Sequence, residues 1–204
     1  FCGISGAVYL LNDVIDIERD RRHPLKSSRP LAAGQISRRL ALWLFGTLSV
    51  ACLLLAYVLE PIFFAVMLAY YLMQCCYSFG LKRLVVLDVM IIALGFLLRV
   101  AAGAVVIHVE ISSWLLLCTF FLSLFIALNK RRHEIGLLKD KAAEHRRVLA
   151  EYTPYLLDQM IAVVTASTVM SYALYTRAPG TVEKHHTGYL IYTVPFVVYG
   201  IFRY

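Results

Sequence analysis

Charged residues are scarce in this sequence. They make up 16% of its 204 positions, whereas 60% of the residues are hydrophobic and the mean hydropathy is +0.71. Because about a quarter of the residues in soluble domains are charged, this balance argues for a membrane protein. Cysteine is also sparse, and its five residues show no C-x-x-C spacing. All five lie in apolar segments, so we expect packed or lipid-facing thiols rather than a disulfide or a metal site.

The apolar residues form successive runs of about 20 residues, which is long enough to cross a hydrocarbon core of about 30 Å. We expect spans at about residues 1–19, 39–59, 61–79, 86–108, 112–129, 156–176 and 186–204. This pattern predicts an all-α fold, a polytopic transmembrane helical bundle formed by residues 1–204 as a single domain. The chain starts at Phe1 and stops at Tyr204 inside apolar stretches, so we also expect it to be a fragment of a longer bundle.

The net charge of +7 follows the predicted topology. Because consecutive spans alternate direction, the loops near 20–38, 80–85 and 130–155 share one side of the membrane. These loops and their flanks contain most of the basic residues: Arg19, Arg21, Arg22, Lys26, Arg29, Arg38, Arg39, Lys82, Arg83, Lys130, Arg131, Arg132, Lys139, Lys141, Arg146 and Arg147. The opposite loops contain Arg177 and Lys184. The positive-inside tendency therefore places the long loops in the cytoplasm, and this distribution argues against binding of nucleic acid.

Three aspartates at the end of the first predicted span lie on one helical stripe. Asp13, Asp16 and Asp20 are spaced i, i+3 and i+7, so they share a face of a helix. Their mutual repulsion is relieved if a cation lies between them, and carboxylates are ligands that Mg²⁺ prefers, together with substrate phosphates and water. The stripe therefore predicts a magnesium-bound diphosphate, although a solvated helix end is the alternative. Asn12 is either a fourth polar ligand or an amide that bonds a neighbouring helix.

The next segment is rich in cations. Lys26 and Arg29 lie on a loop that contains Pro24 and Pro30, which fixes their placement more tightly than topology requires. Fixed cations suit phosphate binding, so we expect both side chains to contact phosphates. His23 either contacts phosphate or orders the loop.

The run N-D-V-I-D-I-E-R-D-R-R-H-P-L-K-S-S-R-P-L-A-A-G resembles the first aspartate-rich motif of the UbiA superfamily of intramembrane prenyltransferases. Three further stretches, at residues 77–82, 88–103 and 130–134, resemble the branch of that superfamily whose members are decaprenyl-phosphate phosphoribosyltransferases. The resemblance implies about nine helices, of which seven would be present here and the first and last would be missing. It also implies that Asn12, Asp13, Asp16 and Asp20 hold Mg²⁺ and diphosphate, and that Lys26 and Arg29 contact phosphates. The candidate substrate contacts in the further stretches are Tyr77, Lys82, Asp88, Arg99, Lys130 and Arg131.

The second acidic position distinguishes between branches of the superfamily. Prenyltransferases of the UbiA type carry a D-x-x-x-D motif there, whereas this chain has Asp88 followed by Ile92. The departure weakens the prenyltransferase interpretation and leaves Lys82 to supply positive charge to a phosphate. Arg99 follows Asp88 by about three helical turns, roughly 16 Å. A charge so deep in a span faces the bundle interior or a polar cavity, where it is either a structural pair or a support for the site.

Residues 130–155 form either a solvated helical hairpin or a cap over the site. We expect Tyr152 and Tyr155, at the end of this segment, to be interfacial aromatics. The sequence shows no obvious Ser/His/Asp arrangement for nucleophilic catalysis, and the predicted reaction does not need one. Substitution at an anomeric carbon passes through an oxocarbenium-like state, and an ionised phosphate acceptor requires no strong general base.

We therefore predict a Mg²⁺-dependent transferase that moves 5-phosphoribose from phosphoribosyl diphosphate to a polyprenyl phosphate resembling decaprenyl phosphate, for synthesis of arabinan-type cell-wall precursors. It would be integral to a bacterial plasma membrane with its site facing the cytoplasm, and its oligomeric state stays open. One alternative is a UbiA-type prenyltransferase that joins a polyprenyl group to an aromatic acceptor. Another is a transporter or lipid-binding protein without catalysis, which the clustering of charge at one face argues against.

Overall fold

The computed structural model describes residues 1–138 and 151–204, and within these ranges the chain forms helices joined by turns, without a strand. The helices are α1 (Cys2–Arg22), α2 (Arg38–Leu59), α3 (Pro61–Phe79), α4 (Leu87–Val106), α5 (Ser113–Leu138), α7 (Pro154–Arg177), α8 (Pro179–His185) and α9 (Val194–Arg203). Two 3₁₀ helices, η1 (Leu81–Arg83) and η4 (Tyr189–Thr193), connect neighbouring elements. The all-α prediction is confirmed.

Local sequence signals explain where several helices begin. The hydroxyl of Ser37 accepts a hydrogen bond from the backbone N–H of Leu40, and Thr153 caps α7 in the same way. Pro61 and Pro154 occupy the first turn of their helices, where the missing N–H has no intrahelical partner to lose. These caps fix the starts of three long helices.

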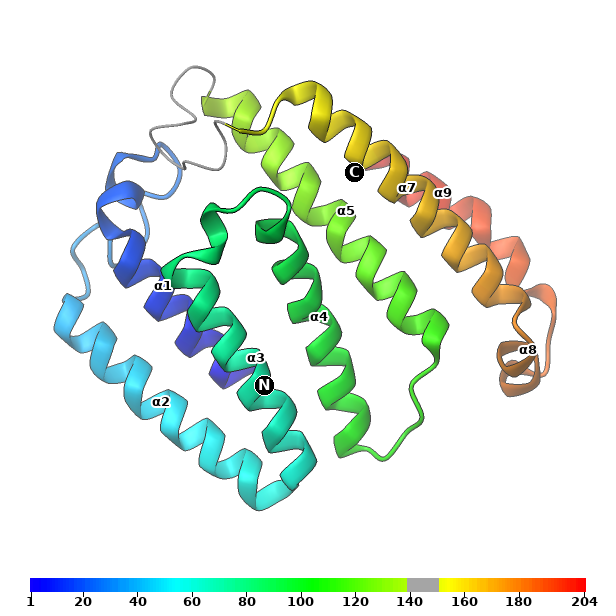
Figure 1. Cartoon of the computed structure of the whole chain (residues 1–204), viewed down its shortest axis with the longest axis horizontal. Helices are drawn as coiled ribbons and strands as arrows, with labels where there is room; N and C mark the ends of the chain where they lie inside the picture. The colour runs from blue at the N-terminus through cyan, green and yellow to red at the C-terminus, as the bar shows by residue number, and fades with distance from the viewer. Residues whose placement is uncertain (139–150) are drawn as a thin grey trace.

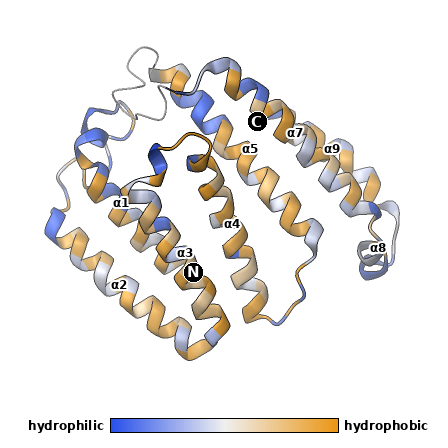
Figure 2. Cartoon of the chain, viewed as in Figure 1, coloured by the Kyte–Doolittle hydropathy of each residue, from blue (hydrophilic) through white to orange (hydrophobic). Residues whose placement is uncertain are grey.

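The helices follow one another around an arc (Figure 1). α1 packs against α2 and α3, α4 packs against α3 and α5, and α7 packs against α5 and α9. Because consecutive long helices run in opposite directions, the first loop, η1 and the end of α5 meet at one end of the bundle. Figure 2 shows hydrophilic residues gathered at this end and hydrophobic residues along most of the helix bodies. We call it the charged end.

Two groups of buried side chains hold the arc together. Ile4, Phe63, Met67 and Tyr70 belong to a cluster that joins α1, α2, α3 and α4. A second cluster, which includes Leu128, joins α4, α5, α7 and α9. Between helices of membrane length, such side chains stabilise the contacts through van der Waals packing rather than through removal from water, so the two clusters hold both walls of the space between them.

Five helices are long and apolar enough to cross a membrane: α2, α3, α4, α5 and α7. These confirm the five predicted spans between residues 39 and 176. α1 covers the first predicted span, but its last turns are charged, and it does not meet the same criteria of composition.

Two predicted boundaries differ from the structure. The last predicted span, 186–204, is a shorter apolar helix, Tyr189–Arg203, which starts as η4 and continues as α9. α5 continues to Leu138, beyond the predicted end of its span near residue 129, because no proline follows Asn129 in this helix and Gly136 does not end it. Residues 130–134 are therefore helical and not part of a loop. The candidate cap falls largely on residues 139–150, with Lys139, Lys141, Arg146 and Arg147, which lie outside the described ranges.

Candidate active site

A cavity of about 1020 Å³ opens within the arc and reaches the charged end. Side chains from α1, α3, α4, α5 and the first loop line it. Its wall includes all of the predicted site residues except Asp13 and Asp88: Asn12, Asp16, Asp20, Lys26, Arg29, Tyr77, Lys82, Arg99, Lys130 and Arg131. Residues from sequence-distant segments thus converge on one space.

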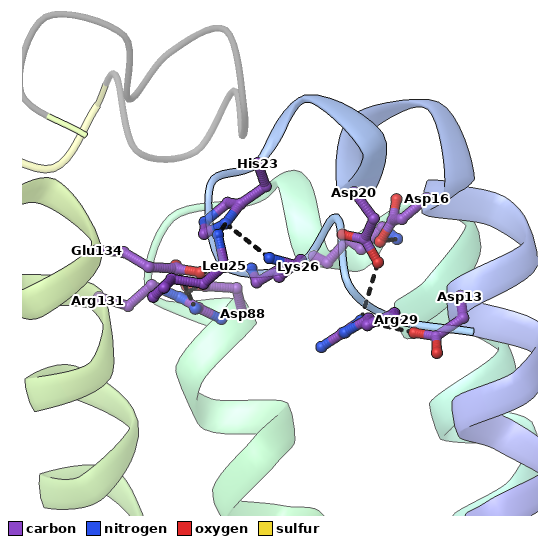
Figure 3. Close-up of polar contacts among 11 residues, drawn as sticks. Asp13, Asp16, Asp20, His23, Leu25, Lys26, Arg29, Asp88, Arg131 and Glu134 are labelled. Carbon is purple, nitrogen blue, oxygen red and sulfur yellow. Dashed lines mark hydrogen bonds and ion pairs between the residues drawn. The ribbon is translucent and has the colours of Figure 1, made fainter. Parts of the chain in front are cut away.

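Arg29 joins two members of the aspartate stripe. Its Nη1 donates to Asp13 Oδ1 at 2.6 Å and to Asp20 Oδ2 at 2.9 Å, so the first loop folds back against α1 (Figure 3). The Asp20 side chain is 9% exposed and that of Arg29 is 40% exposed. The guanidinium offsets the repulsion among the carboxylates while keeping part of its surface open to the cavity.

Lys82 neutralises the third aspartate of the stripe. Its buried ammonium donates to Asp16 Oδ2 at 2.6 Å and to Asn12 Oδ1 at 3.1 Å. The 3₁₀ turn η1, which follows Gly80, directs this lysine from α3 toward α1. Asn12 therefore accepts a hydrogen bond from η1. This contact agrees with the interpretation of Asn12 as an amide that bonds a neighbouring element.

A second set of ion pairs lies on the other side of the cavity (Figure 3). Lys26 Nζ donates to Glu134 Oε1 at 2.8 Å, which ties the first loop to α5. Arg131 donates from Nη1 to Glu134 at 3.1 Å and from Nε to Asp88 at 2.7 Å. The Nδ1 atom of His23 accepts N–H groups from Leu25 and Lys26, which supports the loop-ordering role for this histidine.

Asp88 is enclosed rather than presented to the cavity. Its side chain is 0% exposed, and the Tyr152 hydroxyl donates to its Oδ1 at 2.8 Å. The same hydroxyl accepts the backbone N–H of Val86, whose positive φ of 68° is uncommon for a β-branched residue. Burial and the Asp88 carboxylate raise the pKa of Tyr152 well above its usual range, so this hydroxyl keeps its proton.

The role of Tyr152 differs from the sequence-based expectation of an interfacial aromatic, because the side chain is buried. Glu134 and Tyr70 were likewise missed as cavity residues. Tyr70, Gln74 and Tyr77 are spaced i, i+4 and i+7 on the otherwise apolar α3, so a polar stripe was the available signal. No local sequence pattern indicated that Tyr152 pairs with Asp88, because 64 residues separate the two.

The aspartate stripe fits a metal that substrate helps to hold. Among residues 1–138 and 151–204, no group of three His, Cys, Asp or Glu side chains is arranged to bind a metal ion by itself. Mg²⁺, however, needs only one or two protein carboxylates when substrate phosphates and water complete its shell. Asp16 and Asp20, one turn apart on α1, both line the cavity, whereas Asp13 does not. Assignment of the metal to these aspartates stays a prediction.

An all-helical bundle with several membrane-length helices and a charged cavity at one end is typical of an integral membrane enzyme. The sequence model of the UbiA prenyltransferase family matches residues 1–204 of this chain. The chain belongs to this family of transferases, and it is an integral, multi-pass membrane protein.

Two relatives carry a more specific name. The chain is 39% identical over 175 residues to a decaprenyl-phosphate phosphoribosyltransferase of Mycolicibacterium smegmatis, an alignment that covers 86% of this chain and 55% of the relative. It is 36% identical over 210 residues to a protein of the same name from Corynebacterium glutamicum, covering 100% of this chain and 62% of that protein. The chain therefore spans less than two thirds of the length of these relatives.

Solved structures support the fold. A UbiA homologue from Archaeoglobus fulgidus, determined with GPP and Mg²⁺, superimposes with a TM-score of 0.78 at 22% identity, covering 99% of this chain and 70% of the homologue. A second structure of this homologue, bound to DMAPP and Mg²⁺, also gives a TM-score of 0.78. The helical arc of this chain is thus similar to the fold of this homologue.

Proposed function

We propose that the protein transfers 5-phosphoribose from phosphoribosyl diphosphate to a polyprenyl phosphate and releases diphosphate. The names of relatives that are 36% to 39% identical over most of the chain support this donor and this acceptor. The product would serve the synthesis of arabinan-type cell-wall precursors. The charged end would face the cytoplasm of a bacterial plasma membrane, in agreement with the positive-inside tendency.

The surroundings of Asp88 favour phosphoribosyl diphosphate over a prenyl diphosphate as the donor. A second D-x-x-x-D motif that held a prenyl diphosphate through magnesium would present both carboxylates to the cavity. Here Asp88 is enclosed by Arg131 and Tyr152, and the apolar Ile92 lines the cavity wall. A donor that depends on one acidic motif is therefore favoured over a prenyl diphosphate.

The ion pairs of the charged end suggest how the diphosphate is bound. Arg29 and Lys82 hold the three aspartates in place. When diphosphate and Mg²⁺ bind, these cations exchange part of their contact with the carboxylates for contact with phosphate oxygens. Their positive charge then stabilises the negative charge that develops on the departing diphosphate. Bound Mg²⁺ supplies Lewis-acid stabilisation of that charge.

The acceptor needs fewer catalytic groups from the protein than the leaving diphosphate does. A phosphate monoester is ionised at neutral pH, so its oxygen attacks the anomeric carbon without a general base. The protein must position it and exclude water from the oxocarbenium-like centre. The cavity extends from the aspartates toward Tyr70 and Phe96 between the helices, which gives a membrane lipid a route to the charged end.

The test uses the full-length protein in detergent with Mg²⁺ and polyprenyl phosphate. One reaction receives radiolabelled phosphoribosyl diphosphate, and the other receives a labelled prenyl diphosphate with an aromatic acid. We expect a labelled lipid only from the first donor and its loss in Asp16→Asn. Asp158→Asn is the matched control, because this carboxylate is 53% exposed and pairs with Arg132 outside the stripe. Product only from the prenyl donor would contradict the proposal, and activity indifferent to Asp16 would contradict the metal assignment.

A further inference from the structure

Arg99 lines the cavity from within the membrane-length helix α4. It lies on α4 about three turns, or roughly 16 Å, beyond Asp88 at the start of this helix. Side chains tilt toward the N-terminus of their helix, so the guanidinium is directed back toward the charged end. Arg99 lines the cavity together with Tyr70 and Phe96.

The groups around Arg99 are neutral. Its Nη2 donates to the Tyr70 hydroxyl at 2.8 Å, and that hydroxyl lies 3.2 Å from the Ser5 hydroxyl. Tyr9, another neutral residue, lines the same cavity. The rings of Tyr70 and Phe96 lie 5.4 Å and 5.2 Å from its central carbon, which is within the range of a cation–π contact.

Arg99 differs in this respect from other cations of the cavity. Each of five others is ion-paired with a carboxylate: Lys26, Arg29, Lys82, Arg131 and Arg132. Within the described part of the chain, no carboxylate pairs with Arg99, and its buried Nε has no hydrogen-bond partner. A guanidinium at membrane depth is costly unless an anion or a set of acceptors compensates it. The arrangement is therefore incomplete without an anionic ligand.

We propose that Arg99, positioned by Tyr70, binds a phosphate monoester at the membrane-side end of the cavity. A guanidinium fork donates two parallel hydrogen bonds to phosphate oxygens, a geometry that the single ammonium of lysine does not reproduce. The identity of the ligand rests on the proposed function, in which both substrates carry such a group. These are the phosphate of the polyprenyl acceptor and the 5-phosphate of the sugar donor.

The position of Arg99 suggests that its phosphate ligand lies on the opposite side of the reacting sugar from the departing diphosphate. Asp16, Asp20, Arg29 and Lys82 lie at the charged end, where the diphosphate would bind, and Arg99 lines the same cavity from deeper along α4. A polyprenyl phosphate held there would have its ester group on the membrane side, whereas a sugar 5-phosphate would have its ester bond directed toward the reacting sugar. Binding at Arg99 would therefore align one substrate with its anionic group inside the bundle and its remainder along the cavity.

The experiment measures binding directly and so does not depend on transfer. Dissociation constants of polyprenyl phosphate and of ribose 5-phosphate are measured for the full-length protein, with polyprenol and ribose as ligands that lack the phosphate. Arg99→Gln removes the charge, Arg99→Lys keeps it, and Tyr70→Phe removes only the orienting hydroxyl. Arg38→Gln is the matched control, because this arginine is exposed at the start of α2 and does not line the cavity.

We expect Arg99→Gln to weaken binding of one of the two phosphates roughly 10- to 100-fold. Arg99→Lys recovers part of that loss, and polyprenol and ribose are unaffected. A loss for polyprenyl phosphate assigns the lipid to Arg99, and a loss for ribose 5-phosphate assigns the sugar. Unchanged affinity for both phosphates in folded Arg99→Gln protein would overturn the inference. If wild-type protein transfers no phosphoribose but still binds a phosphate through Arg99, the proposed function fails and the binding site stands.

Discussion

Replacement of Arg131 by glutamine is expected to destabilise the bundle far more than the same replacement at its neighbour Arg132. The Arg131 side chain is 7% exposed and its partner Asp88 is 0% exposed, whereas Arg132 and Asp158 are 39% and 53% exposed. Removing one partner of a buried ion pair leaves an uncompensated charge, at a cost of about 3–5 kcal/mol. An exposed pair contributes about 0–1 kcal/mol.

Thermal unfolding in detergent measures the difference. For a domain of this size, 1 kcal/mol changes the midpoint by about 2–4 °C. Arg131→Gln should therefore lower Tm by roughly 6–20 °C, and Arg132→Gln by no more than about 4 °C. Scans at one fixed rate allow comparison even if unfolding is irreversible.

The double variant Asp88→Asn/Arg131→Gln tests the cause. Without either charge, the buried pair of neutral side chains costs less than one unpaired ion, so the double variant should be more stable than the sum of the single changes predicts. Equal Tm values for Arg131→Gln and Arg132→Gln, or strictly additive single changes, would refute the assignment of a buried ion pair.

Three further substitutions, the first with a matched control, probe the charged end and the cavity wall. Tyr152→Phe removes the hydroxyl that bridges Asp88 and a backbone N–H, and should destabilise by about 1–3 kcal/mol. Tyr155→Phe, at an exposed position, should change Tm little when measured in parallel. Lys82→Met should weaken binding of diphosphate by roughly 10- to 100-fold in a direct titration, because a charge-assisted hydrogen bond is lost; unchanged affinity would exclude this lysine from the site. Gly95→Ala should reduce transfer without unfolding the protein, since Gly95 lines the cavity and the added Cβ would lie 2.8 Å from the end of the flexible Gln74 side chain, which must shift. Full activity in the transfer assay would show that this wall does not contact substrate.

The sequence was sufficient for much of the helical frame and for one wall of the site. Hydrophobic runs of membrane length are local signals, so the helices α2, α3, α4 and α7 could be predicted with boundaries close to those observed, as could the start of α5. The helical period placed Asp13, Asp16 and Asp20 on one face, and the structure pairs all three with cations from the first loop and η1.

The contacts between distant segments could not be predicted in this way. Lys26 and Glu134 are 108 residues apart, and their pairing depends on how the first loop packs against α5. The burial of Tyr152 depends on the enclosed Asp88 and on the strained backbone at Val86. The last apolar segment is also shorter as a helix than its hydropathy predicted, because it begins at Tyr189, after Gly188, with the 3₁₀ turn η4.

The most direct test of the central claim follows two phosphorus labels in one reaction. The full-length protein receives polyprenyl phosphate, Mg²⁺ and phosphoribosyl diphosphate labelled either at the 5-phosphate or at the terminal phosphate of the diphosphate. Transfer of 5-phosphoribose predicts that the first label enters the lipid and that the second is released as diphosphate. A lipid that carries the terminal label, or no labelled lipid from either donor, would contradict it.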